Sequence, residues 1–454
     1  MKIKASRLIL ISLLIAALVN LLNCGGSTSG ESEVIENQTS RQSIPTANVN
    51  TSNSSDEFLI VSLDGSGDYT SIQSAVDVAE PGDTIQVRTG VYKESVWITK
   101  SGTPDKPITL MAYPGDVPTI DPTGTGHGGN ASPDQNGIYI SKGAKWWIID
   151  GFEIKGGYNG VKIGPGGSSN ITIRNNYVHD SNYQGILIVN ANDILIANNE
   201  IHSNGIDGDE CFFNLSSGYV NTPSKCHGIY MSNFDQTGVQ RITIRGNYIH
   251  TQGGAGIQTY DSASEVLIEN NLLVNTSHGM WLGGIQNSVV RNNTLVLISP
   301  VAIKPTDQSQ YYSVIDSRWG NKTTLAGNVV KNNIVYVSQS SFNGFPVYVL
   351  AMPDVDSSTW SVNYNLWYAP SNTKWIWKNT VKTDFNSEYK QTTGWDKNGP
   401  SIPSDPMFVD LSQHNYSIRS SSPAIDNGDP TSASKLDLTR KPRDSKPDIG
   451  AYEY

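Results

Sequence analysis

The sequence predicts an all-β solenoid in which short strands stack, coil upon coil, into a rod. Two repeats and the composition support this fold class. The motif apolar-x-apolar-x-Asn-Asn-x-apolar returns at a unit of 22 to 24 residues, and Gly-apolar-x-apolar returns in phase with it. Glycine fills 42 of 454 positions, and short polar steps separate Ile and Val. Such a composition is typical of strands joined by tight turns.

The second Asn of the first motif marks each coil. It stands at Asn176, Asn199, Asn247, Asn271, Asn293 and Asn333, with gaps of 23, 48, 24, 22 and 40 residues, so two coils carry insertions. A unit this small cannot bury its own apolar face and must stack on its neighbours. Stacking at ~4.8 Å per coil gives a rod of about ten coils, roughly 50 Å long. We expect the Asn side chains to form internal ladders.

The chain begins with features of an exported protein. Residues 1–23 combine a basic start with an apolar run from Leu8 to Leu22, which predicts a secretory signal segment. The alternative is a transmembrane helix, but the apolar run is shorter than the ~20 residues that such a helix needs. Leu21-Leu22-Asn23-Cys24 resembles a bacterial lipobox. That resemblance implies acylation of Cys24 and a lipid anchor in the outer membrane or at the cell surface. Residues 24–56 are rich in Ser, Thr and Asn, and we expect a flexible tether.

The folded part follows the tether. Ile72, Ala75, Val76 and Ala79 share one face of a predicted helix over residues 68–79, which we expect to close the N-terminal end of the rod. We assign residues 57–340 to the solenoid and residues 341–454 to its C-terminal coils and closing segment. We expect a monomer.

Charge is scarce and net negative. The chain has 32 Lys and Arg against 42 Asp and Glu, a formal charge of −10, and only 16% of its residues are charged. Loss of the basic signal segment makes the balance more negative. Phosphate contacts need an excess of Lys and Arg, so the composition excludes nucleic acid as the expected partner.

Several segments resemble a known family. The opening DGSGDYTSIQSAVDVA with GDTIQV, GVYKESV and PITLMAYPG is similar to the first coils of bacterial polysaccharide lyases and pectin methylesterases. The end, SDPMFVD, SSPAIDNG and DIGAYEY, is similar to the closing segment of secreted β-helix proteins. The repeat as a whole resembles the right-handed parallel β-helix of pectate-lyase-like proteins. The resemblance implies this single-stranded fold and a polysaccharide partner.

Equivalent outward positions of stacked strands form columns along such a rod. The x of Gly-apolar-x-apolar gives Tyr139, Lys162, Leu187, Tyr230, Gln258 and Trp281. Aromatic rings can cover the C–H faces of sugars and a cation can meet a carboxylate, so Tyr139, Lys162 and Trp281, with Asp261 nearby, are candidate substrate-binding residues. The alternative is ordinary β-forming residues. A second column, with Asp150, Arg174, Glu269 and Arg291, is better explained by exposed ion pairs.

The insertion before His227 concentrates acids. Asp207, Asp209 and Glu210 are hard oxygen ligands that suit Ca²⁺, which lyases of this fold use to neutralise a uronate carboxylate; the alternative is a solvated acidic turn. With Cys24 acylated, Cys211 and Cys226 remain as an even pair in an oxidising compartment, which predicts a disulfide. A metal site at the two thiols is the weaker interpretation.

His227 and Tyr230 follow this insertion, in an arrangement suited to a base and acid pair. His278 stands at the equivalent position two coils later, and Lys304 is a further catalytic candidate. The alternative is a turn ladder in which His replaces an amide, because Asn136, Asn159 and Gln184 fill the same place in earlier coils.

We therefore hypothesise a polysaccharide lyase that cleaves a uronate-containing glycan by β-elimination. One alternative is a carbohydrate- or matrix-binding surface protein without catalysis, and another is a glycoside hydrolase that uses a pair of carboxylates. The chain departs from the most similar lyases, which have a denser Asp cluster and a Lys after Asp-Gly-Trp-Asp. It also lacks the Asp-Phe-Ile-Phe-Gly strand and Tyr-Gln-Asp-Thr turn of pectin methylesterases.

Overall fold

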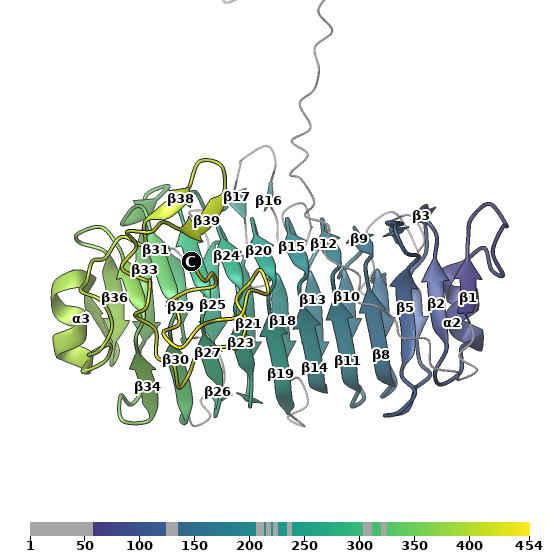
Figure 1. Ribbon diagram of the computed structural model, residues 1–454, viewed down its shortest axis with the longest axis horizontal. Coiled ribbons are helices and arrows are strands. Elements are labelled where there is room, and N and C mark those ends of the chain that lie inside the picture. Colours follow the sequence, from purple (N-terminus) through teal and green to yellow (C-terminus); the bar gives the residue numbers. More distant parts are fainter. Residues whose placement is uncertain are drawn as a thin grey trace, which may run out of the picture. The chain divides into compact units, whose positions relative to one another are not determined.

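The computed structural model describes residues 58–123, 135–205, 213–214, 219–220, 226–233, 238–302, 311–318 and 325–454. In this part the chain winds into a rod with three long sheets (Figure 1). Each coil adds one strand to the first, the second and then the third sheet, and the strands of successive coils pair in parallel along the rod. Only β32 (Ser341–Phe342) and β37 (Thr380–Lys382), at the C-terminal end of the third sheet, pair antiparallel within the three described sheets. The predicted all-β parallel β-helix is confirmed.

The first sheet forms the face on which each coil begins. Its main path is β1 (Phe58–Val61), β2 (Thr84–Val87), β5 (Ile108–Ala112), β8 (Lys145–Asp150), β11 (Ser169–Arg174), β14 (Asn192–Ala197), β19 (Val239–Arg245), β23 (Leu267–Glu269), β27 (Val289–Arg291), β30 (Asn328–Lys331) and β34 (Trp360–Asn363), with β22 (Ala263–Ser264) and β26 (Ile285–Gln286) beside it. Alternation buries Ile171 and Ile173 and turns Thr172 outward, as a period of two requires.

The second sheet has shorter strands. It consists of β3 (Val91–Tyr92), β6 (Thr119–Ile120), β9 (Glu153–Lys155), β12 (Tyr177–His179), β15 (Glu200–His202), β20 (Tyr248–His250), β24 (Leu272–Val274), β28 (Thr294–Leu297), β31 (Ile334–Val337) and β35 (Leu366–Tyr368). The middle residue of most three-residue strands, such as Val178 and Ile201, points into the core. The two flanking residues therefore face outward.

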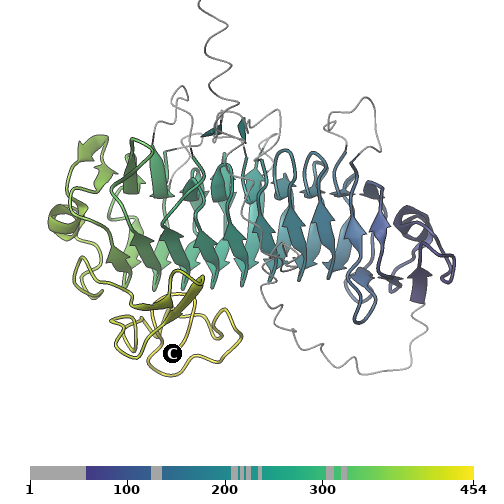
Figure 2. The same ribbon diagram turned by 90° about the horizontal axis from the view of Figure 1, so that it is seen from above.

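The third sheet completes each coil. It consists of β4 (Val96–Ile98), β7 (Ile138–Ile140), β10 (Val161–Ile163), β13 (Ile186–Val189), β18 (Ile229–Ser232), β21 (Ala255–Tyr260), β25 (His278–Leu282), β29 (Tyr312–Asp316), β33 (Phe345–Met352), β36 (Lys374–Trp377) and β37 (Thr380–Lys382), with β32 (Ser341–Phe342) beside β33. A small hairpin, β16 (Phe213–Asn214) and β17 (Tyr219–Val220), belongs to the first insertion (Figure 2).

Helix α2 (Ile72–Val78) closes the N-terminal end, beside β1, as predicted (Figure 1). Ile72, Ala75 and Val76 are buried. The helix begins four residues later than expected because Ser71 caps it, with its hydroxyl accepting a hydrogen bond from the Ser74 N–H.

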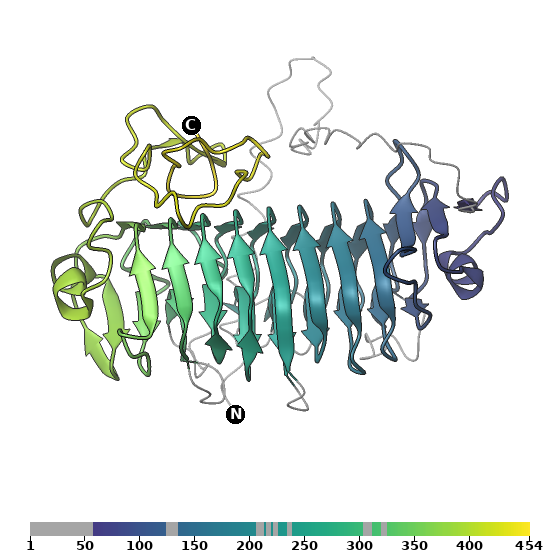
Figure 3. The ribbon, with the colours of Figure 1, turned by 60° about the horizontal axis from the view of Figure 1, so that its bottom comes forward.

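The C-terminal end differs from simple further coils. Helix α3 (Phe385–Thr393) follows β37, and the chain then returns along the rod through the hairpin β38 (Phe408–Asp410) and β39 (Asn415–Ile418) (Figures 2 and 3). Phe408, Tyr416 and Ile449 form a second apolar cluster with Leu272 and Val296 of the second sheet. The tail therefore covers the outer face of that sheet in its C-terminal half. No helix in the described ranges is long and apolar enough to cross a membrane.

The predicted Asn ladder runs inside the turn between the first and second sheets. The Nδ2 group of each buried Asn donates to Oδ1 of the Asn one coil further on, at 2.9 to 3.2 Å. The ladder extends past Asn333 to Asn365 and ends at Asp396, which the sequence reasoning missed. Oδ2 of Asp396 accepts from Trp367 Nε1 and from the Tyr389 hydroxyl, so one carboxylate ends the series.

Candidate functional site

The outer face of the third sheet carries the predicted column of side chains in register. Tyr139 pairs with Lys162, and the series continues through Leu187, Tyr230 and Gln258 to Trp281. The column begins one coil earlier than predicted, at Trp97, and reaches Asp316 one coil later. Trp97 was missed because Glu94-Ser95 replaces the Gly that marks the motif elsewhere.

The N-terminal part of this column is aromatic, cationic and open to solvent. The rings of Trp97 and Tyr139 meet edge to face with centroids 5.4 Å apart, and Lys162 Nζ lies 4.7 Å from the centre of the Tyr139 ring. Trp97 is 40% exposed. Beside the column, the rings of Tyr158 and Tyr183 contact each other from adjacent coils, with centroids 5.1 Å apart. The arrangement offers ring faces and an ammonium group along the rod axis.

Tyr230 lies in the middle of the column, partly buried. Burial raises the pKa of its hydroxyl to about 12, and the nearby Tyr183, Tyr260 and Asp261 act in the same direction. Asp261 follows directly after β21, in a left-handed conformation with φ of 58°. At neutral pH the Tyr230 hydroxyl therefore keeps its proton, which suits a proton donor and not a base.

His227 belongs to a buried turn ladder between the second and third sheets. The side-chain oxygen of Gln184 accepts from the His227 N–H at 2.6 Å, and His227 Nδ1 accepts from the Ala255 N–H at 3.0 Å. Gln184 N–H donates to Asn159 Oδ1 in the preceding step, and Asn159 Nδ2 donates to Asn136 Oδ1 one coil earlier. The imidazole thus takes the place of an amide oxygen, the alternative that the sequence left open. Its tautomer carries the proton on Nε2, so Nδ1 is not available as a base.

His278 and Trp281 lie deeper than the predicted roles require. Both side chains have almost no exposed surface, and their ring centroids are 4.3 Å apart. Ser313 Oγ pairs with His278 Nδ1 and accepts from Trp281 Nε1. Burial, followed by the charge of Arg318, holds the pKa of His278 well below its usual value, so the ring is neutral. Groups this buried do not contact a polymer in this conformation, and neither residue enters our proposal.

Arg318, which is partly buried, forms an ion pair with the fully buried Asp316 that the sequence did not predict. The guanidinium donates to both oxygens of Asp316, with the shortest contact at 2.6 Å. It also lies 3.9 Å from the ring centre of Tyr311 and 5.2 Å from that of Tyr348. The repeat pattern is broken after the second insertion, so no motif places these two residues together. The irregularity itself is the only sequence signal at this position.

The remaining predicted site residues fall outside the described ranges. These are Cys24, Asp207, Asp209, Glu210, Cys211 and Lys304. Cys226 is fully buried and disulfide-bonded, and its pairing with Cys211 stays a prediction. The Ca²⁺ site and the catalytic Lys304 likewise stay predictions.

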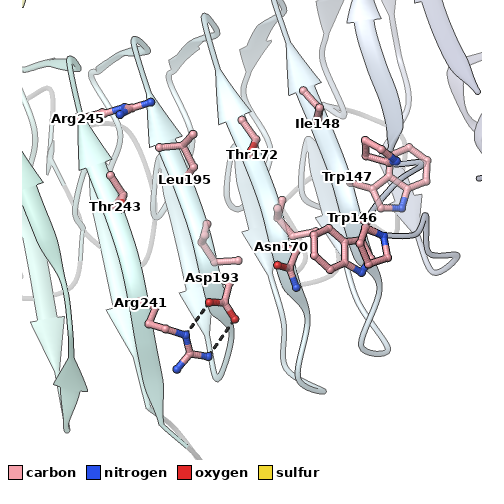
Figure 4. Close-up of a pocket in the computed structure, with 14 residues that line it drawn as sticks. Trp146, Trp147, Ile148, Asn170, Thr172, Asp193, Leu195, Arg241, Thr243 and Arg245 are labelled. Atoms are coloured by element: carbon pink, nitrogen blue, oxygen red, sulfur yellow. Dashed lines mark hydrogen bonds and ion pairs between the residues drawn. The ribbon is translucent and has the colours of Figure 1, made fainter. Parts of the chain in front are cut away.

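A shallow hollow of about 510 Å³ lies on the outer face of the first sheet (Figure 4). Trp146 and Arg241 border it, and Arg241 donates to both carboxylate oxygens of Asp193 at 2.6 and 3.0 Å. Trp146 adopts φ of 61°, a rare conformation for a bulky residue. The sequence did not predict this hollow, because no residue type repeats at its border. Equivalent positions of β8, β11, β14 and β19 hold Trp146, Asn170, Asp193 and Arg241.

The charged column above this hollow was predicted as ion pairs. Arg174 donates to Asp150 at 2.7 Å and Arg291 to Glu269 at 2.7 Å, so the predicted ion pairs form, although Glu269 is buried and not exposed as expected. The Arg245 side chain has no hydrogen-bond or ion-pair partner among the described residues. The first sheet therefore offers mainly neutralised charge.

Comparisons with known proteins agree with this architecture. Residues 63–211 match the family model "Pel9A-like, right handed beta helix region", and residues 213–347 match "Right handed beta helix region". Pectate lyase PEL9 of Emericella nidulans is 37% identical over 145 residues, which span 28% of this chain and 35% of that enzyme. The match thus covers about a third of the relative's length.

Two solved structures share the fold. The pectate lyase Pel9A has a TM-score of 0.51 at 17% identity, covering 85% of this chain and 91% of that one. An alginate lyase from Paenibacillus sp. has a TM-score of 0.51 at 19% identity, covering 67% and 94%. Together with the strand register, the two family models identify the fold as a pectate-lyase-like right-handed parallel β-helix.

Proposed function

We propose that the protein binds a uronate-containing polysaccharide along the outer face of the third sheet and cleaves it by β-elimination. The observation that carries the proposal is the column in which Trp97, Tyr139 and Lys162 follow one another in register, with Tyr230 one coil beyond Leu187. The matches to lyases of this family support the reaction class.

The column suits a polymer because it repeats along the rod. Successive coils place a new side chain every ~4.8 Å, so an extended glycan parallel to the axis meets several of them at once. Trp97 and Tyr139 supply apolar ring faces, and Lys162 supplies a cation for a uronate carboxylate. Arg318 is less suited to that task, because Asp316 already neutralises it.

Tyr230 takes the role of proton donor. In β-elimination a base removes the C5 proton, the electrons form the C4–C5 double bond, and the C4–O bond breaks with its oxygen taking up a proton. A tyrosine whose pKa is raised to about 12 holds a proton for that leaving oxygen. With His227 held in the turn ladder, we propose Lys304, the further catalytic candidate of the sequence, as the base. A Ca²⁺ ion held by Asp207, Asp209 and Glu210 would neutralise the substrate carboxylate.

The proposal is tested by ultraviolet absorbance of unsaturated uronate with pectate, alginate and glycosaminoglycans, each with Ca²⁺ and with chelator. Tyr230→Phe is expected to lower kcat at least about a hundredfold at an unchanged melting temperature. Tyr336→Phe, which removes a hydroxyl from the second sheet, is the matched control. Reducing ends without absorbance would indicate a hydrolase and contradict the elimination.

A second candidate is a carbohydrate-binding surface protein without catalysis. The ladder position of His227 and the burial of His278 favour it, because neither imidazole is placed as a base. The same assay separates the two functions. Retention on immobilised polysaccharide without turnover on any of the substrates would establish the binding function and contradict the lyase.

We also propose that the protein is exported and anchored through a lipid on Cys24, which only the sequence supports. Metabolic labelling with a fatty acid and membrane fractionation test this. Cys24→Ala is expected to abolish the label and release the protein. A labelled Cys24→Ala variant would contradict the assignment.

A further inference from the structure

Three histidines stack on the outer face of the second sheet, away from the proposed polysaccharide column. β12, β15 and β20 each end in one, so that His179, His202 and His250 lie in register. Their rings are nearly parallel, with centroids 5.0 and 4.7 Å apart. Glu200 stands at the start of β15, on the same outer face. Nothing in the proposed lyase reaction uses this cluster.

The hydrogen bonds orient two of these rings alike. Nδ1 of His202 pairs with Ser203 Oγ at 2.9 Å, and Nδ1 of His250 pairs with Thr251 Oγ1 at 3.1 Å. Both Nε2 atoms therefore point toward the same space. Nε2 of His202 is buried and has no hydrogen-bond partner within the described ranges. An unpartnered buried nitrogen needs an explanation, such as an ion that the site accepts.

We propose that Glu200, His202 and His250 bind one transition-metal ion of the Zn²⁺ class. One ligand atom from each residue lies within 4.8 Å of the other two. Two imidazoles and one carboxylate form a ligand set that Zn²⁺ accepts, with water in the remaining position. Ca²⁺ prefers sites made of oxygen atoms and fits this one poorly. The site is thus distinct from the predicted Ca²⁺ ligands.

The geometry requires only a small adjustment. His250 Nε2 and Glu200 Oε1 are 3.3 Å apart, close to the ~3.4 Å that separates two ligands of a tetrahedral ion with bonds of about 2.1 Å. The His202 ligand atom lies within 4.8 Å of the other two, and a change in χ2, which is a soft torsion, would shorten this distance. The Glu200 side chain is 44% exposed, so an ion can enter from its side.

The neighbouring His179 explains why the site is confined to two coils. Its Nε2 pairs with Glu153 at 3.1 Å and its Nδ1 with Asp180 at 2.8 Å, so both nitrogens are already used. The hydroxyl groups of Ser203 and Thr251 pair with Nδ1 of His202 and His250, and a partner on the non-ligating nitrogen commonly fixes the orientation of a metal-bound histidine. An ion held there would cross-link β15 and β20, the two strands on either side of the first insertion.

Tag-free full-length protein is titrated with ZnCl₂ by calorimetry and with CoCl₂ by visible absorption. We expect one ion per chain and the intense d–d bands of four- or five-coordinate cobalt. His202→Asn and Glu200→Gln should each weaken binding at least about tenfold. His414→Asn removes an imidazole from the hairpin β38–β39 and should leave binding unchanged. An excess of Ca²⁺ should not displace the ion.

Melting temperatures of the metal-free variants verify that each is folded. Absence of a binding signal at roughly 1 mM zinc would overturn the proposal. So would binding that His202→Asn and Glu200→Gln both leave within about threefold of the parent protein, since the ion would then sit elsewhere. Because the readout is metal binding, lyase activity could fail without affecting the result.

Discussion

The Asn ladder inside the rod and the outward column of the third sheet share one geometry but differ in sequence. The ladder repeats one residue type, from Asn176 to Asn365, and each amide is almost completely buried. The outward column changes its residue at every coil, from Trp97 to Trp281. A self-complementary amide must repeat to satisfy its neighbour. An outward position has no such neighbour to satisfy, so its residue can differ from coil to coil.

The second turn ladder shows the limit of that rule. Asn136 and Asn159 are followed there by Gln184 and then His227, yet all four are buried and bond coil to coil. Variation along a column therefore indicates function only where the side chains face outward. His227 meets the requirement of the ladder because Nδ1 accepts a hydrogen bond as an amide oxygen does.

The largest effect is expected from a break in the Asn ladder. Asn247 Oδ1 accepts from the N–H and Nδ2 of Asn199, and its Nδ2 donates to Ile196 O and Asn271 Oδ1. Asn247→Ala leaves several of these buried groups unpaired. We expect the free energy of unfolding to fall by about 3–5 kcal/mol, measured by chemical denaturation.

Asn398→Ala serves as the control for Asn247→Ala. Asn398 is exposed, and surface changes of this kind usually stay within about 0.5 kcal/mol. Equal losses in the two variants would contradict the view that the ladder stabilises the rod through its side chains.

A smaller effect is expected at His227. His227→Ala leaves the buried Ala255 N–H without an acceptor, which costs about 1–3 kcal/mol. His227→Asn restores an acceptor of the kind that earlier coils use, and should recover at least half of that loss. Denaturation and the lyase assay are measured on both variants. Equal, severe losses of turnover at full stability would instead assign His227 to the reaction.

The sequence predicted the repeating parts of the molecule and missed those that occur once. The period of Asn176, Asn199 and Asn247 reports a contact between identical neighbours, so the ladder and the strand order could be read from it. Asp396 ends the same ladder without its motif, and the pair of Asp316 and Arg318 stands where the repeat is interrupted. Such contacts depend on where distant turns meet, which no local pattern encodes.

The candidate site also has a part that the repeat predicted and a part that it did not. The register of Tyr139, Lys162 and Tyr230 followed from spacing alone. The burial of Trp281 did not, because the same outward position is partly exposed at Tyr230 and covered at Gln258 one coil later. The depth of a side chain depends on its neighbours in three dimensions.

A pH dependence of stability is expected from His278. Burial lowers its pKa in the folded state, whereas the unfolded chain takes up a proton near the ordinary pKa of ~6.5. Stability is therefore full above that value and falls as the pH drops below it. The contribution is at most about 1.4 kcal/mol per pH unit. Denaturation of His278→Gln between pH 7 and 5 should show a shallower slope, and an unchanged slope would remove His278 as the cause.

The smallest effect concerns the open end of the outward column. Trp97→Ala removes the most exposed ring of the column and its edge contact with Tyr139, but no ladder hydrogen bond. We expect an acidic oligosaccharide to bind about fivefold more weakly, roughly 1 kcal/mol, at an almost unchanged melting temperature. Phe58→Ala removes an exposed ring from the first sheet and is the matched control. If both variants lose affinity equally, the rings contribute through non-specific contact, and the third sheet is not the binding face.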